Sequence, residues 1–590
     1  MKVRVLHLAN SLVSKIHLFL NDKQFLIFSS ILVGISAGLG AVLLKTFVHF
    51  IRQFLFDTDI DEIKYLYLLF PFVGIVLVVF LVKPFLKNDV NVGGVGILHS
   101  IAKKGSFLPF EKMYSYIMTS GLTVGFGGSA GLESPIVSTG AAIGSNFARV
   151  NKLTYKERTL LLAAGAAGGI SAAFNAPIAG VLFALEVILV DISITAFIPL
   201  LIASVSGALM SNIILKEGIL LSFQNLRSFD YHNVPFYIIL ACLTGLMSLY
   251  YVNVFQKFES LFEKVKSKVV RIIVGCVILI GLLFVFPSLF GEGYDSIKFL
   301  SGNQMEKIFK GSPLYLAAYS NFAVVIMLTA VMFLKVFAVS ATIGSGGVGG
   351  NFAPSLFVGA YLGYLFAFIC GLFNIDLPLS NFTLVAMAGI LSGVFHSPLT
   401  AIFLIAEISG GYSLIIPLMI VSAISYLIVK YFHPESMDIK KLKNSGAVLS
   451  ENKDASILSR IDLPKLIEKD FAQLKRTDTL KVVIENVKHN RRNVFPVLDE
   501  NNYLEGIVRL DSIREEMFKP HLYDKISVKD IMEKSSVRIS LTDNIFSVMK
   551  KFEETGDWNL PVVDNGVYLG FLSKSSILST YRNELIYSYN

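Results

Sequence analysis

Charge is scarce in this chain of 590 residues. Only 16% of the residues are Asp, Glu, Lys or Arg, whereas a soluble domain averages about 25%. Hydrophobic residues make up 54% of the chain, and the mean hydropathy is +0.63. This composition excludes an ordinary soluble protein and indicates a polytopic α-helical membrane protein. About half of the charges that are present follow Met437, so we expect a soluble tail after a membrane-embedded body.

Cysteine and histidine are also rare. The three cysteines, Cys242, Cys276 and Cys370, lie in apolar stretches and give neither a disulfide framework nor a metal site. The nine histidines are scattered, and no HExxH or GxSxG run lies in the apolar part, so we expect no enzyme, metal or cofactor there. The net charge of +8 comes without a recognisable nucleic-acid module. Basic residues flanking membrane segments explain it, and no nucleic acid is expected as a partner.

Apolar stretches divide the membrane body, predicted over residues 25–445. Crossing a bilayer takes roughly 20 apolar residues, and runs of that length lie at 25–56, 65–86, 234–256, 269–290, 314–341 and 412–432. Shorter runs, bounded by Gly, Pro or Ser, lie at 112–126, 135–150, 158–173, 177–190, 193–215, 354–373, 382–395 and 399–409. Non-helical backbone at membrane depth survives only where protein buries it or water lines it. The fragmentation therefore favours half-helices that meet inside an inverted repeat. Residues 1–24 mix basic and apolar residues at helical spacing and predict an N-terminal interfacial helix on the cytoplasmic side.

Two pairs of segments repeat each other in the two halves of the body. Gly131–Pro135 opens one apolar run and Gly350–Pro354 opens another, with further glycines at the same offsets. A second pair, Phe174–Glu186 and Phe395–Glu407, follows at nearly the same distance, and each member ends in a glutamate. For these two glutamates we expect helix packing or a polar helix end. Paired, interrupted apolar segments at matching positions point to a transporter site at the membrane midplane.

A glycine-rich break precedes each copy of the first pair, at Gly127–Gly131 and Gly344–Gly350. Such a break before a helix aims free backbone N–H groups and the positive end of the helix dipole at one point, which makes an anion site without a buried cation. No Gly-Lys-Ser/Thr run follows, so a phosphate loop is excluded. Only one copy carries a carboxylate, because Glu133 corresponds to Phe352 in the other. Glu133 is either a gate that competes with the anion until protonated or a structural cap, and we expect a gate because ionisable groups within membranes are usually functional.

Together these motifs resemble the CLC family of chloride channels and chloride/proton antiporters. The resemblance covers roughly residues 25–445 and is carried by Gly127–Gly144, Phe174–Val187 and Gly344–Pro354. It implies an inverted repeat of tilted, partial helices, assembled as a homodimer with one pathway per subunit. Glu133 falls on the family's gating glutamate, and Phe352 falls on its pore-lining phenylalanine. The predicted anion-binding set is Val95, Gly96, Gly131, Leu132, Asn351, Phe352 and Ala353.

Five positions depart from the family pattern. Leu132 and Ser134 flank Glu133 where the family usually has a basic residue and Gly. Val95 replaces a serine whose hydroxyl would reach the central anion, and Asp438 falls on the central tyrosine. Val187 follows Glu186 where antiporters commonly carry a second, proton-relaying glutamate. Val187 and Asp438 are therefore secondary site candidates, and the missing relay favours an uncoupled conductor.

The tail, predicted over residues 446–590, repeats an α/β unit twice. Strands Val494–Leu498 and Leu504–Val508 precede a helix near Ser512–Met517, and strands Leu560–Val563 and Tyr568–Leu572 precede a helix from Lys574. The tail resembles tandem CBS domains, at about 466–518 and 526–582. CBS pairs often bind adenine nucleotides through an aspartate, for which Asp511 is the nearest candidate here. A structural tail that supports the dimer is the preferred interpretation.

We therefore expect transport of chloride or a related small inorganic anion, gated by Glu133, channel-like and uncoupled. The alternative is proton-coupled anion antiport, with protons as a second partner. A more distant alternative is a membrane-anchored sensor that acts through the CBS tail. The expected location is a plasma or inner membrane, with the tail in the cytoplasm.

Overall fold

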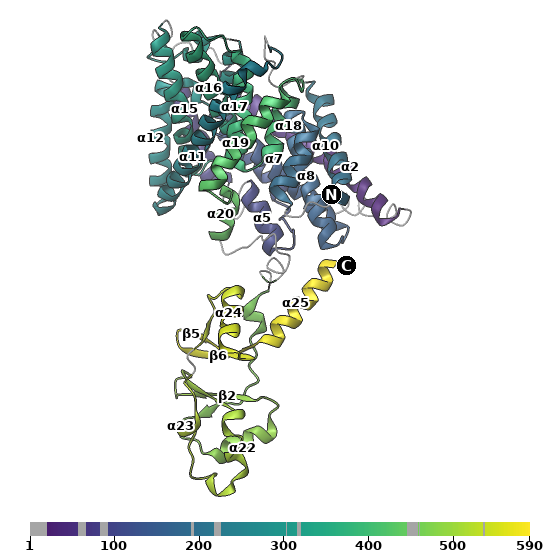
Figure 1. The fold of residues 1–590 in the computed structure, drawn as a ribbon, viewed down its shortest axis with the longest axis vertical. Helices are drawn as coiled ribbons and strands as arrows, with labels where there is room; N and C mark the ends of the chain where they lie inside the picture. The colour runs from purple at the N-terminus through teal and green to yellow at the C-terminus, as the bar shows by residue number, and fades with distance from the viewer. Residues whose placement is uncertain are drawn as a thin grey trace. The chain divides into compact units, whose positions relative to one another are not determined.

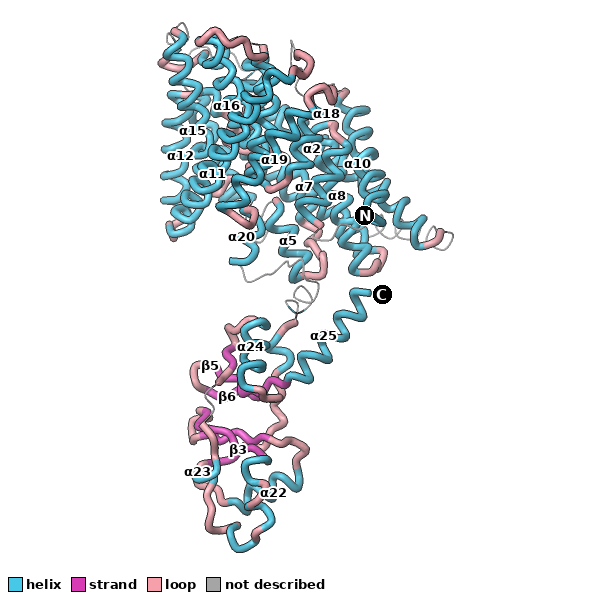
Figure 2. The backbone as a smooth tube through the Cα atoms, viewed as in Figure 1, coloured by secondary structure: helices cyan, strands magenta, loops and turns pink. Residues whose placement is uncertain are grey.

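The computed structural model describes residues 20–56, 66–82, 93–189, 194–216, 226–302, 304–315, 320–444, 458, 461–534 and 537–589. The chain forms two compact units, Met1–Ser445 and Gly446–Asn590. Helices make up the regular structure of the first unit over its described residues, whereas the second mixes strands and helices (Figures 1 and 2).

The first half of the membrane unit contains α2 (Asp22–Phe56), α3 (Phe70–Val76), α5 (Gly94–Lys103), α6 (Lys112–Gly125), α7 (Glu133–Val150), α8 (Tyr155–Phe174), α9 (Pro177–Phe183) and α10 (Ile194–Leu215). The second half contains α11 (Val234–Lys264), α12 (Lys268–Val285), α13 (Tyr294–Ser301), α14 (Met305–Phe309), α15 (Asn321–Gly344), α16 (Phe352–Leu372), α17 (Leu379–Phe395), α18 (Pro398–Ile408), α19 (Ile415–Phe432) and α20 (Met437–Asn444). In the first half α2 packs against α8 and α10, and in the second half α11 packs against α17 and α19.

Seven helices in the described ranges are long and apolar enough to cross a membrane, namely those built on α2, α10, α11, α12, α15, α16 and α19. Within the predicted crossing at 65–86, the described residues 66–82 form a 3-10 turn, α3 and a π-helical segment in direct succession. Both α10 and α16, which the sequence analysis grouped with the shorter runs, are long and apolar enough to cross. Pro199 lies inside α10 without ending it, which is tolerated where neighbouring groups satisfy the freed backbone. Residues 1–19 of the helix predicted over 1–24 lie outside the described residues, and residues 22–24 belong to α2.

The two halves contact each other reciprocally, as a two-fold relation between them requires. Gly131 N–H donates to Gly350 O and Gly350 N–H donates to Gly131 O, both at 2.8 Å, in an antiparallel bridge. Asn175 ends α8 and His396 ends α17 with the same left-handed backbone, at φ 54° and φ 57°. The repeat read from the sequence is therefore a structural repeat.

Side chains follow the same two-fold pattern. Thr123 Oγ1 accepts a backbone N–H from the second glycine-rich break, and Thr342 Oγ1 accepts one from the first, each at 3.0 Å. The Glu186 carboxylate accepts two backbone N–H groups of α18 at 3.0 and 2.8 Å, and the Glu407 carboxylate accepts two of α9 at 3.0 and 2.9 Å. Each glutamate thus caps the short helix of the opposite half, where unpaired N–H groups need acceptors.

The tail contains two three-stranded sheets, each with its own apolar core. The first holds β1 (Leu474–Lys475), β2 (Val494–Leu498) and β3 (Leu504–Arg509), with α22 (Leu480–His489) and α23 (Val528–Ile531). The second holds β4 (Ile539–Ser540), β5 (Asn559–Asp564) and β6 (Val567–Ser573), with α24 (Ile545–Thr555) and α25 (Lys574–Tyr589). In both sheets the first pair of strands is parallel and the second antiparallel. The helix predicted near Ser512–Met517 is wrong, since short 3-10 turns occupy this segment.

Charged pairs lie on the surface of the tail. Arg492 donates to both carboxylate oxygens of Asp470, at 2.8 and 2.7 Å, and its guanidinium lies 4.6 Å from the centre of the Phe471 ring. These hydrogen bonds hold the pKa of Asp470 below its usual value. Asp511, the nucleotide candidate, is exposed and pairs with Arg514 at 2.6 Å.

Candidate anion pathway

Two helix N-termini meet at the centre of the membrane unit. The bridge between Gly131 and Gly350 brings the first turns of α7 and α16 together, so the positive ends of both helix dipoles lie close to one another. Pro135 and Pro354 occupy the first turn of each helix, where a missing N–H breaks no helical hydrogen bond. A third helix start, that of α5, is tied to α7 because Gly93 N–H donates to Ser138 Oγ at 2.8 Å.

Glu133 lies at this meeting point. It is the first residue of α7 and is 3% exposed. The Tyr294 hydroxyl donates to Glu133 Oε1 at 2.6 Å, while Oε2 has no hydrogen-bond partner among the described residues. A methyl group added at Gly131 would lie 2.2 Å from Oε2, so this oxygen rests against bare glycine backbone. A carboxylate oxygen therefore occupies space beside the paired helix starts.

Two cavities reach Glu133. The α13 cavity has a volume of about 800 Å³ and is lined by residues from α2, α13 and the segments beside them; the α20 cavity has a volume of about 740 Å³ and is lined by residues from α5, α7, α11, α16 and α20. Of the residues that the structure describes, Glu133 alone lines both. An ion that moves from one cavity to the other therefore has to pass this carboxylate.

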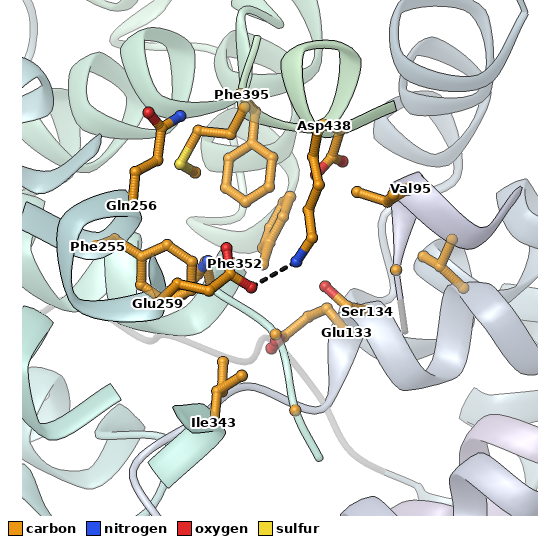
Figure 3. Close-up of a pocket in the computed structure, with 18 of the residues that line it drawn as sticks. Val95, Glu133, Ser134, Phe255, Gln256, Glu259, Ile343, Phe352, Phe395 and Asp438 are labelled. Carbon is orange, nitrogen blue, oxygen red and sulfur yellow. Dashed lines mark hydrogen bonds and ion pairs between the residues drawn. The ribbon is translucent and has the colours of Figure 1, made fainter. Parts of the chain in front are cut away.

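The predicted site residues divide between these cavities. Val95, Asn351, Phe352, Val187 and Asp438 line the α20 cavity, where Figure 3 shows Val95, Phe352 and Asp438 grouped around the same space as Glu133. Leu132 lines the α13 cavity. The remaining three, which line neither cavity, are Gly96, Gly131 and Ala353.

Phe352 is part of an aromatic wall. Its ring lies 5.5 Å from that of Phe174, 5.3 Å from Phe395 and 6.4 Å from Phe183. Phe183, Phe352 and Phe395 all line the α20 cavity. These edge and tilted contacts fix the orientation of Phe352 beside the pathway.

The two cavities differ in charge. Cationic side chains outnumber acidic ones around the α13 cavity, which is lined by Lys45, Arg52, Lys298, Lys307 and Lys310 and by Glu133, Glu292 and Asp295. Acidic side chains outnumber cationic ones around the α20 cavity, which is lined by Glu133, Glu259, Glu263 and Asp438 and by Lys440 and Lys441. A cationic surplus raises the local concentration of anions, so the α13 cavity is the better collector of anions.

Two residues that hold this region together, Lys335 and Tyr294, are not among the predicted site residues. Lys335 of α15 is 0% exposed, and its Nζ donates to Ser129 Oγ at 2.9 Å, Gly291 O at 3.1 Å and Leu289 O at 3.3 Å. A lysine inside the apolar run 314–341 was a visible signal, because charges at membrane depth are rare. Tyr294 gave no such signal, because its contact with Glu133 depends on folding. No group of three or more His, Cys, Asp or Glu side chains that could hold a metal occurs in the described part of the chain.

Half-helices meeting at an internal two-fold relation, with one carboxylate between two cavities, define the class of inverted-repeat membrane transport proteins. The family model for voltage-gated chloride channels matches residues 74–430, and the chain belongs to this family, the CLC proteins. Two CBS-domain matches follow at 463–519 and 528–583.

Some relatives of this chain are named as channels and others as exchangers. The chloride channel protein CLC-f of Arabidopsis thaliana is 25% identical over 537 residues, which are 79% of this chain and 67% of the relative. The H(+)/Cl(-) exchange transporter ClcA of Vibrio cholerae is 26% identical over 425 residues, 67% of this chain and 84% of the relative. A solved slow cyanobacterial Cl-/H+ antiporter shares the fold, with a TM-score of 0.62 at 22% identity over 72% of this chain and 98% of its own. The chain is thus a multi-pass membrane protein with the CLC fold and CBS domains.

Proposed function

We propose that the chain conducts chloride, or a closely related small inorganic anion, passively between the α13 cavity and the α20 cavity, with Glu133 as the gate. The observation that carries this proposal is one carboxylate beside paired helix N-termini, at the residue that, within the described ranges, is alone shared by the two cavities. Amide N–H groups and helix dipoles there suit a small anion.

The gate works by competition. An ionised Glu133 carboxylate occupies the space beside Gly131 that an anion would take, so the pathway is closed. Protonation removes the negative charge and weakens its hold on the helix starts, and a change of membrane voltage pulls on the same charge. The anion then passes Glu133 and moves along the wall formed by Phe352 into the α20 cavity.

Proton-coupled antiport is the alternative function. It is supported by the relative named as an exchanger, and opposed by Val187, which places an apolar side chain on the α20 cavity where a proton relay would be useful. Anion flux from proteoliposomes, recorded together with external pH in chloride, nitrate and fluoride, separates the two. Flux without proton movement supports the conductor. Uphill proton movement at a fixed ratio to anion supports the antiporter, and no flux of any anion contradicts both and favours the sensor.

For the assembly we propose a homodimer in a plasma or inner membrane, with the tail in the cytoplasm. We propose that the tail supports this dimer rather than binding adenine nucleotide, because the Asp511 carboxylate is engaged by Arg514. The test is to add increasing concentrations of adenine nucleotide to the tail and to measure the thermal unfolding midpoint of the tail at each concentration. A midpoint that rises with nucleotide concentration would contradict the proposal that the tail binds no adenine nucleotide, since a ligand of the folded state raises stability by mass action.

A further inference from the structure

A second carboxylate lies on the pathway, at the start of α5. Asp438 is the second residue of α20 and lines the α20 cavity. A methyl group added at Gly94 would lie 2.1 Å from Asp438 Oδ2, so this oxygen rests against the backbone of the first residue of α5. The relation repeats that between Glu133 and Gly131, with a carboxylate oxygen against a glycine at a helix start in both places.

Two helices, α20 and α11, contribute charged side chains to the cavity around Asp438. On α20 itself Lys440 and Lys441 line the same cavity, and on α11 Glu259 and Glu263 do so. Lys441 Nζ is bound to Glu259 at 2.5 Å, which is the ion pair drawn in Figure 3. Lys441 is therefore already engaged by a carboxylate other than Asp438.

The remaining residues near Asp438 belong to α5 and α7, the helices whose first turns line the proposed anion pathway. From α7 the same cavity receives Glu133 and Ser134, and from α5 it receives Gly93, Gly94 and the apolar side chain of Val95. Val95 offers no hydroxyl or amide side chain to an anion. Asp438 is thus the ionisable side chain beside the first turn of α5, where backbone N–H groups have no helical acceptor.

We propose that Asp438 is a second gate of the anion pathway, closed when its carboxylate is ionised and opened by protons from the α20 cavity. The inference rests on the proposed anion pathway and deepens it. Ionised, the carboxylate holds the positive end of α5 and repels an incoming anion. Protonated, it loses that charge, and its O–H becomes a donor that can point at the anion, which supplies the hydrogen bond that Val95 lacks.

A purely structural role predicts something different. A cap that only stabilises α5 would be fixed in one protonation state, and its replacement by asparagine would change stability without changing the response of flux to pH. The cavity around Asp438 makes the group reachable by water and protons, so the gate and the cap differ in a measurable way.

The test uses the full-length protein in a planar bilayer, with chloride current recorded while the pH on each side is stepped in turn. With the other side held at pH 4.5 so that Glu133 is protonated, acidifying the α20 side of the wild type from pH 7.5 to pH 4.5 should raise the current at least about tenfold, because an ordinary carboxyl passes from almost fully ionised to partly protonated over that range. In D438N, with the other side again held at pH 4.5, the current should already be high at pH 7.5 on the α20 side and change less than about twofold when that side is acidified. The response to the other side should remain. D376N, which neutralises an exposed aspartate paired with Arg227 outside both cavities, is the matched control and should behave as wild type.

Each outcome decides between the claims. Loss of the response on one side only in D438N supports the second gate. A wild-type response in D438N, while E133Q still alters gating, overturns the role of Asp438 and leaves the anion pathway standing. If D438N does not fold, D438S serves in its place, and a wild-type response there has the same meaning. No chloride current from the wild type overturns both the pathway and this inference.

Discussion

Lys335 provides the most direct test of how the centre of the membrane unit is held together. Its ammonium group has three N–H bonds, and three oxygens receive them, at Ser129, Gly291 and Leu289. The Phe357 ring lies 4.7 Å from Nζ and covers another side of the charge. Because Ser129 belongs to the first glycine-rich break, this lysine ties α15 to the segment that leads into α7.

The K335M variant removes the charge while keeping the length of the side chain. Each buried acceptor left without its donor costs about 1–3 kcal/mol, and relief of the desolvation of a buried charge offsets part of the total. The net loss of unfolding free energy should be about 2–4 kcal/mol. Since 1 kcal/mol lowers the midpoint of a domain of 150–250 residues by about 2–4 °C, and that of a unit about twice as large by about half as much, we expect a fall of roughly 2–5 °C.

The assay is the thermal midpoint of the purified protein in detergent, measured at one heating rate for all variants because unfolding of such proteins is often irreversible. K264M is the matched control, since Lys264 is exposed at the end of α11, and it should shift the midpoint little. A K335M protein as stable as the wild type would refute the reasoning, because the three oxygens would then have found other donors at no cost.

Three further predictions follow from individual contacts. E186A and E407A should each lower the unfolding free energy by about 1–3 kcal/mol, measured by thermal midpoint, and a loss in only one of them would contradict the reciprocal capping. G131A should disturb gating, because its methyl group would lie 2.2 Å from the gate carboxylate, whereas G371A has nothing within 4 Å and should conduct as wild type. Equal flux in the two would argue against this close contact. In the tail, the lowered pKa of Asp470 contributes stability that is present above its unfolded value of about 4 and lost as the pH falls through the folded value. Urea unfolding of D470N should therefore differ from wild type at pH 7 and converge with it near pH 2.

The sequence allowed the repeat and the gate candidate to be predicted because both depend on local chemistry. Gly-rich breaks followed by apolar runs specify helix starts, and a carboxylate at one of them is visible in the letters alone. In the structure Pro135 and Pro354 lie in the first turns of their helices, where the same local rules allow them. These features needed no knowledge of which helices pack together.

Contacts between distant segments could not be predicted in this way. The Tyr294 hydroxyl reaches Glu133 across 161 positions of sequence, and Lys335 reaches Ser129 across 206. No periodicity encodes such pairs, since they arise from the packing of helices. The hydrogen-bonding pattern within 66–82 could not be predicted for a related reason, because an unbroken apolar composition does not reveal where the backbone changes from 3-10 to α and then to π.

The most direct test of the central claim is chloride flux as a function of pH for wild type and E133Q in the same liposomes. Glutamine keeps the shape of the side chain and removes its charge, so E133Q should conduct at neutral pH where wild type is closed, and should keep only the dependence on pH that Asp438 gives from the α20 side. Equal expression and the same elution volume as wild type would show that the variant is folded. An E133Q protein whose flux still closes at neutral pH as in wild type would contradict the assignment of Glu133 as the gate.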